Sequence, residues 1–187
     1  MKCSVFIATS ADGYIAKCDG SVDWLHTCGD QNADMSRNPD MGFNAFIKSV
    51  DSMIMGRKCL ETIASMNLTT EQWPYGDIKI IALSRTLSTP PKGLPVEVDM
   101  YAGDIAALIS ELSGKGYQHA YIDGGATITA FLNLNLIDEM IITQAPVVLG
   151  SGIPLFGKLD SPIDLEHTST NAFANHFMQT KYKIRRD

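Results

Sequence analysis

Cysteine is scarce in this sequence, and its four copies form no recognisable motif. Cys3, Cys18, Cys28 and Cys59 lie far apart, and no Cys-x-x-Cys pair occurs among them. This spacing excludes the common zinc-binding and dithiol redox motifs. The first residues lead directly into a strand-like run rather than a signal-peptide pattern. We therefore expect reduced thiols in a cytoplasmic protein.

Long apolar runs and an excess of positive charge are also missing. A membrane helix needs about 20 apolar residues, but residues 132–149 are interrupted by Asn133, Asp138, Glu139 and Pro146. The chain carries 15 Lys and Arg against 21 Asp and Glu, which gives a formal net charge of −6. A phosphate-backbone partner would need a local basic patch against this background. We expect a small-molecule substrate, and neither a membrane nor a nucleic acid as a partner.

Several catalytic motifs are absent as well. The sequence has no Gly-x-Ser-x-Gly elbow for nucleophilic catalysis. Its four histidines have no metal-binding spacing, so we expect no metal. Residues 152–159 resemble a phosphate-binding P-loop, but Leu159 stands where Ser or Thr is needed, and Pro154 removes an N–H group. We interpret this segment as a loop.

Apolar residues alternate between strand and helix spacing along most of the chain. We predict strands at 4–8, 14–16, 53–55, 79–83, 96–98, 120–122 and 137–143. We predict helices at 39–50, 58–66, 105–112 and 126–134, the first of them with Asn38 as its N-cap. Segments 164–170 and 176–185 are typical of a terminal hairpin. The pattern predicts one α/β domain, residues 1–187, with a mostly parallel sheet flanked by helices and a C-terminal antiparallel hairpin at its edge.

Two glycines separate a predicted strand from a predicted helix at Ile122-Asp123-Gly124-Gly125-Ala126. Their spacing is not the Gly-x-Gly-x-x-Gly dinucleotide fingerprint. Glycines nevertheless let a ligand approach the backbone closely, and a helix N-terminus offers free N–H groups to a pyrophosphate. A tight turn without any ligand explains the pair equally well.

Cationic residues follow two other predicted strands. Gly56-Arg57-Lys58 follows the strand at 53–55, and Ser84-Arg85-Thr86 follows the strand at 79–83. The carboxyl ends of parallel strands meet at one edge of a sheet, where open α/β sheets bind their ligands. Because Arg suits bidentate contact with phosphate, these residues could form an anion pocket. The alternative is that they are ordinary exposed cations.

An ordered set of segments resembles the dihydrofolate reductase superfamily from Cys3 to the terminal hairpin. The set comprises Ala8, Asp12-Gly13-Tyr14-Ile15-Ala16, Trp24, Met53-Ile54-Met55-Gly56-Arg57-Lys58, Leu83-Ser84-Arg85 and Ile122-Asp123-Gly124-Gly125. Within the superfamily, the chain is most similar to the reductase domain of the bacterial riboflavin-biosynthesis deaminase-reductase. Three segments carry that similarity: Ser10-Ala11-Asp12-Gly13, Asp123-Gly124-Gly125 and Pro146-Val147-Val148-Leu149-Gly150.

The resemblance implies NADPH as cofactor. It implies that the backbone at Ala8 and Ile15 lies near the nicotinamide, with Trp24 near a mobile loop. The adenosine phosphates would be held at the turn that begins with Gly56, by Arg57, Lys58, Ser84 and Arg85. The pyrophosphate would be held by Gly124, Gly125, Ala126, Thr127 and Ile128, in agreement with the glycine pair discussed above.

The resemblance also implies two candidate substrate residues. Asp40 lies sixteen positions before Gly56, where dihydrofolate reductases carry an acidic residue on their first helix. There it could bind an aminopyrimidine ring, and partial burial would raise its pKa towards a range useful for proton relay as the catalytic residue. Alternatively, Asp40 merely stabilises the positive end of the helix. In the riboflavin branch, the acidic residue before the glycine pair faces the substrate, which makes Asp123 the second candidate.

Some features depart from the riboflavin branch. The segment after Gly56 lacks its Thr-Val-Leu-x-Asp-Asp-Pro stretch, and the first helix carries only Lys48 rather than an arginine for a ribose phosphate. We also expect no zinc-binding deaminase domain ahead of the reductase domain. We therefore expect an NADPH-dependent reductase that acts on a pyrimidine- or pterin-like molecule and resembles 5-amino-6-(5-phosphoribosylamino)uracil reductase. A dihydrofolate reductase and a non-catalytic NADPH-binding protein are the alternatives. The riboflavin branch suggests a homodimer, although the terminal hairpin fits a monomer equally well.

Overall fold

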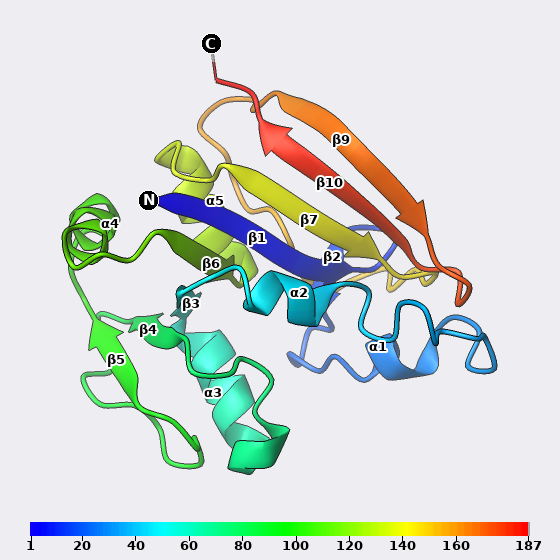
Figure 1. Cartoon of the computed structure of the whole chain (residues 1–187), viewed down its shortest axis with the longest axis horizontal. Coiled ribbons are helices and arrows are strands. Elements are labelled where there is room, and N and C mark those ends of the chain that lie inside the picture. The colour runs from blue at the N-terminus through cyan, green and yellow to red at the C-terminus, as the bar shows by residue number, and fades with distance from the viewer. Residues whose placement is uncertain (187) are drawn as a thin grey trace.

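The structure is a computed structural model that describes residues 1–186 (Figure 1). In chain order its elements are β1 (Lys2–Thr9), β2 (Tyr14–Ala16), α1 (Trp24–Thr27), α2 (Phe43–Ile47), β3 (Ser52–Gly56), α3 (Arg57–Ser65), the 3-10 helix η1 (Thr70–Gln72), β4 (Lys79–Leu83), β5 (Val98–Tyr101), α4 (Ile105–Gly114), β6 (His119–Asp123), α5 (Gly125–Asn133), β7 (Glu139–Gln144), β8 (Ile153–Pro154), β9 (Leu165–Ala172) and β10 (Met178–Ile184). Among the described residues, no helix combines the length and apolar character needed to cross a membrane.

Eight strands form one sheet in the order β5-β4-β3-β6-β1-β7-β10-β9. The strands from β5 to β7 run parallel to one another, β10 is antiparallel to β7, and β9 is antiparallel to β10. Figure 1 shows β5 and β9 at the two opposite edges. The predicted α/β fold, with its mostly parallel sheet and C-terminal antiparallel hairpin, is confirmed.

The central strands are buried on both faces, as parallel strands covered by helices require. Side chains such as Ile54 and Ile122 point to one face, where they pack with residues of α4 and α5. Their neighbours Met53 and Met55 point to the other face and pack with residues of α2 and α3. Each fully buried apolar side chain contributes about 1.5–3 kcal/mol to folding. These two apolar layers hold the sheet rigid beneath its carboxyl edge.

The predicted helix over residues 39–50 is mostly wrong. Only Phe43–Ile47 is helical, and its N-cap is Gly42 rather than Asn38. Met41 and Gly42 both have positive φ, at 51° and 88°, which interrupts any helix entering from Pro39. Residues before Phe43 therefore form turns, and the apolar spacing that indicated a longer helix belongs to two different local structures.

Other differences involve short elements. The helix α1 and the 3-10 helix η1 are absent from the sequence prediction, and the strand expected at 96–98 lies at Val98–Tyr101. The segment 152–159, interpreted as a loop, contains β8, which pairs with β2 in a separate two-stranded sheet. Such short elements depend on contacts with distant parts of the chain, so periodicity gives no signal for them.

Candidate functional site

The carboxyl ends of four parallel strands border one cavity of about 620 Å³. The strands β1, β3, β4 and β6 bring Ala8, Gly56, Leu83 and Asp123 to this edge. The starts of α3 and α5 and residues of β2 complete its wall. The predicted site residues that line this cavity are Ala8, Ile15, Gly56, Arg57, Lys58, Asp123, Gly124, Gly125, Ala126 and Thr127.

The glycine pair lies against other parts of the chain with no room for a side chain. Gly124 has a φ of +89°, and a Cβ there would lie 2.5 Å from the Sγ of Cys59. A Cβ on Gly125 would lie 2.6 Å from the carbonyl oxygen of Pro154 in β8. Burial raises the pKa of the Cys59 thiol to about 12, so it is a neutral packing group beneath the turn. The turn therefore depends on glycine at both positions.

The start of α5 presents unpaired backbone donors. In the described part of the chain, the N–H groups of Gly125, Ala126 and Thr127 have no protein acceptor, as is usual for the first turn of a helix. The N–H of Ile128 differs, because it donates to the carbonyl of Gly124 at 2.8 Å. The Ile128 side chain is fully buried in the core. The expected part for Ile128 in a pyrophosphate cradle therefore does not fit its geometry.

Among the described residues, the Lys and Arg side chains that line the cavity all come from α3. Arg57 and Lys58 line it, and the Arg57 guanidinium donates to Glu61 at 2.7 Å in an i,i+4 ion pair. Ser84 and Arg85 lie outside the lining. The hydroxyl oxygen of Ser84 accepts the N–H of Leu87 at 2.8 Å and thereby closes the turn after β4. Of the two cationic segments in the sequence, the structure brings only the first to the cavity.

Trp24 lies apart from the cavity lining. Its side chain is buried in a small cluster with Ala145 and Phe177, and its indole N–H has no partner in the described residues. The next residue, Leu25, lines the cavity instead. The structure therefore places the neighbour of Trp24, and not Trp24 itself, in the cavity lining.

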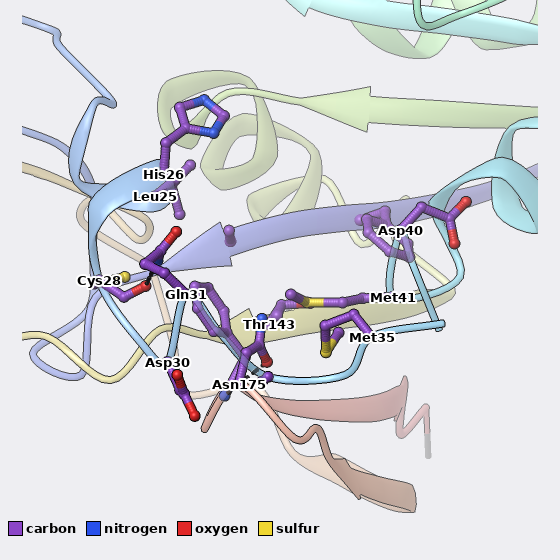
Figure 2. Close-up of a pocket in the computed structure, with 14 residues that line it drawn as sticks. Leu25, His26, Cys28, Asp30, Gln31, Met35, Asp40, Met41, Thr143 and Asn175 are labelled. Atoms are coloured by element: carbon purple, nitrogen blue, oxygen red, sulfur yellow. Dashed lines mark hydrogen bonds between the residues drawn. The ribbon is translucent and has the colours of Figure 1, made fainter. Parts of the chain in front are cut away.

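A second cavity of about 400 Å³ adjoins the first, because Ala8 and Leu25 line both (Figure 2). One side of it is formed by residues 28–41, here named the wall segment. The wall segment rests on the tip of the β9–β10 hairpin: the Asp30 N–H donates to the carbonyl of Asn175 at 3.2 Å. Gly29 has a φ of +78°, and a Cβ there would lie 2.5 Å from the same oxygen. The cavity thus depends on a close contact between residues far apart in sequence.

Asp40 borders the second cavity, but its pKa shifts in the direction opposite to the prediction. Its carboxylate accepts the N–H of Asn44 at 2.7 Å and the N–H of Gly42 at 3.0 Å. These bonds, chiefly the one from Asn44, lower the pKa of Asp40 below its ordinary value. The expectation that burial raises this pKa is wrong, because Asp40 is little buried and its oxygens are held at the start of α2. The geometry fits the alternative interpretation, a carboxylate that stabilises the start of the helix.

Asp123 has the raised pKa that was expected of Asp40. It keeps part of its surface open to the larger cavity, yet protein surrounds its carboxyl group, and this burial raises its pKa to about 6. Tyr121 donates its hydroxyl proton to the carbonyl of Phe6 at 2.8 Å and lies 3.4 Å from Oδ1 of Asp123. The effect of burial outweighs the hydrogen bonds from the Gly124 N–H and the Tyr121 hydroxyl, both of which lower the pKa of Asp123. Asp123 therefore keeps its proton beside the cavity up to about pH 6.

The sequence interpretation did not identify Tyr121, or any residue of the wall segment except Asp40, as part of the site. Alternation along a strand was an available signal for Tyr121, because residues two apart point to the same face and Asp123 was already a candidate. Residues 30, 31, 33 and 35 of the wall segment carry no comparable pattern. Among the described residues, no group of three His, Cys, Asp or Glu side chains could hold a metal ion.

A model of the RibD C-terminal domain family matches residues 2–178 of this chain. The chain belongs to this family of reductase domains. The resemblance drawn from the glycine pair and the Gly-Arg turn is thereby confirmed at the level of the family. The matched residues include the strands and helices that line both cavities.

Individual relatives agree with this assignment. The Bacillus subtilis protein YwjB, itself uncharacterized, is 34% identical over 173 residues, which cover 92% of this chain and 92% of YwjB. A crystal structure of a Shewanella sp. PV-4 protein named for riboflavin biosynthesis is 40% identical, has a TM-score of 0.88 and covers 100% of both chains. Dihydrofolate reductase from Enterococcus faecalis, solved with NADP(H), is 15% identical with a TM-score of 0.63, and the match covers 99% of this chain and 97% of that one. At that identity, the likeness to dihydrofolate reductase concerns the fold alone.

Proposed function

We propose that this protein is an NADPH-dependent reductase that transfers a hydride to a C=N or C=O bond of a pyrimidine- or pterin-like small molecule. The observation that carries the proposal is the pair of adjoining cavities with Ala8 and Leu25 in their common wall. A two-substrate reaction needs two sites in contact, and the larger cavity is within the usual size range of about 300–1,000 Å³ for small-molecule sites.

The residues of the larger cavity fit a dinucleotide. Gly124 and Gly125 admit a ligand close to the backbone, and the free N–H groups at the start of α5 suit a pyrophosphate. Arg57 and Lys58 suit the phosphate on the adenosine ribose. Apolar residues such as Ile7 and Ile15 suit the nicotinamide end and exclude water there. When bound, NADPH supplies the hydride.

The protein itself contributes orientation and a proton. Fixing two rings in contact can lower a barrier by roughly 7–11 kcal/mol in well-aligned systems. Asp123, with its pKa raised to about 6, is the candidate group to hold the proton that a reduced C=N or C=O bond must receive. Tyr121 keeps this carboxyl group in place through its contact at 3.4 Å.

The proposal is tested by titrating the protein with NADPH while monitoring nicotinamide fluorescence, then by measuring NADPH oxidation with a panel of pyrimidines and pterins. We expect saturable binding and oxidation with at least one compound of the panel. Absence of NADPH binding contradicts the proposal. Tight binding without oxidation favours a non-catalytic NADPH-binding protein, and turnover confined to dihydrofolate favours a dihydrofolate reductase.

A further inference from the structure

Charge is divided unequally between the two cavities. The larger cavity has Arg57 and Lys58 in its lining, whereas the smaller one has Asp30 and Asp40. No Lys or Arg lines the smaller cavity in the described part of the chain, and His26 is its one lining side chain that can take a positive charge. Figure 2 shows Asp30 and Asp40 at opposite ends of this cavity, with neutral side chains such as Thr143 and Met41 between them.

The start of α2, which borders the smaller cavity, offers no replacement for these missing cations. A phosphate or carboxylate is usually held by Arg, Lys or free N–H groups at the start of a helix. Here the N–H groups of Gly42 and Asn44, at the start of α2, already donate to the Asp40 carboxylate. Arg37 belongs to the wall segment but is exposed and does not line the cavity.

Backbone N–H groups donate to both carboxylates, and those on Asp40 lower its pKa. Oδ1 of Asp30 accepts the N–H of Asn32 at 2.9 Å, and Asp40 accepts the two bonds described above. A carboxylate held by N–H donors retains its negative charge. An anionic group entering this cavity would therefore meet two negative charges and no positive side chain except a protonated His26.

From this arrangement we propose that the smaller cavity binds an uncharged or cationic amino-substituted heterocycle whose side chain carries neither phosphate nor carboxylate. This substrate class rests on the reductase function proposed above and narrows it. A phosphoribosyl chain and a glutamate tail are both disfavoured, since each would bring negative charge towards Asp30 and Asp40. The substrate would therefore come from a reaction that removes a phosphate or never adds one.

The test compares pairs of ligands with the same ring, of which one member carries an anionic group and the other does not. One pair is 5-amino-6-ribosylaminouracil and its 5′-phosphate, and the other is a dihydropterin with a neutral hydroxyalkyl chain and dihydrofolate. Binding of each to the NADPH-loaded protein is measured by calorimetry, and oxidation of NADPH is followed in parallel. We expect the member without phosphate or carboxylate to bind at least tenfold more tightly in one pair or both. Equal affinities, tighter binding of the anionic members or no binding of any member contradicts the proposal.

Two variants test whether the smaller cavity causes this preference for ligands without phosphate or carboxylate. Asp30→Asn keeps an oxygen to accept the Asn32 N–H while it removes the charge, so it should reduce the preference at least threefold. Asp34→Asn is the matched control, because Asp34 accepts the Ser36 N–H at 2.9 Å in the same segment but does not line the cavity. An equal effect of the two variants contradicts the proposal. NADPH binding measured without substrate separates the two hypotheses: its absence counts against the reductase function, whereas normal NADPH binding with a preference for anions counts only against this substrate class.

Discussion

At the scale of single residues, Asp123 couples stability to pH. Its pKa is raised by burial from the ordinary 3.8 to about 6, so the folded protein holds this proton more tightly than the unfolded chain. The contribution of Asp123 to stability is therefore greatest below about pH 4 and decreases as the pH rises through 6. Above that pH, the ionised carboxyl group destabilises the fold by up to about 3 kcal/mol.

We predict that Asp123→Asn removes this dependence. The variant should gain stability relative to the parent protein as the pH rises from about 4 to about 7, because an amide does not ionise. Urea unfolding at both pH values measures the difference in the free energy of unfolding between variant and parent. A difference that is the same at the two pH values would show that Asp123 is not the titrating group.

Gly125 is a second single position with a large expected effect. A Cβ in Gly125→Ala would meet the carbonyl oxygens of Pro154 and Leu155 at 2.6 and 2.9 Å, and backbone atoms cannot easily move away. We predict a loss of about 1–3 kcal/mol of stability from this overpacking, together with weaker NADPH binding. The control is Gly114→Ala in α4, where a Cβ meets nothing within 4 Å. That change should leave stability unchanged or raise it by up to about 1 kcal/mol. Thermal unfolding measures the stability of both variants.

At the scale of elements, a substitution at the start of α3 should weaken cofactor binding and leave the stability of the fold nearly unchanged. The ion pair between Arg57 and Glu61 is half-exposed, and such i,i+4 pairs contribute about 0.3–0.5 kcal/mol. Arg57→Ala should therefore change stability little, while a lost charged contact with phosphate should weaken NADPH binding about 10- to 100-fold. NADH lacks that phosphate, so its affinity should hardly change. Fluorescence titration with both nucleotides measures the two affinities.

Glu61→Ala is the matched variant for the same helix. It breaks the same ion pair but leaves the Arg57 guanidinium free for phosphate, so NADPH affinity should be retained or increased. A loss of NADPH affinity equal to that of Arg57→Ala would mean that the pair acts through the structure of the helix. An equal loss of NADH affinity in Arg57→Ala would mean that Arg57 does not select for the extra phosphate.

At the scale of the whole molecule, β9 is an edge strand whose outer side pairs with no other strand among the described residues. All eight residues of β9 are exposed, the strand pairs with β10 on one side, and it contains neither proline nor lysine. Leu165 on β9 and Met178 on β10 expose large apolar side chains. Proteins usually shield a long edge strand of this kind. We propose that two copies of the chain associate through β9 to form a homodimer.

Sedimentation velocity tests this association. We predict a dimer for the parent protein and a monomer for Ser169→Lys, because Ser169 is near the middle of β9 and two copies of the lysine would face each other across a two-fold axis. Ser113→Lys, which adds the same charge on an exposed position of α4, should remain dimeric. A monomeric parent protein would contradict the proposal.

The α/β order, the turn at Gly124-Gly125 and the cationic start of α3 could all be predicted from the sequence. These features have local causes, since apolar periodicity and glycine conformation act over a few residues. Only the tertiary structure decided which residues share a cavity: Lys58 lines one and Arg85 does not, and the wall segment lies on the hairpin tip near Asn175. In the folded structure the pKa of Asp40 is lowered rather than raised, and it is Asp123 whose pKa is raised. Burial and hydrogen bonds between distant segments have no local signature, because they arise only when the chain has folded.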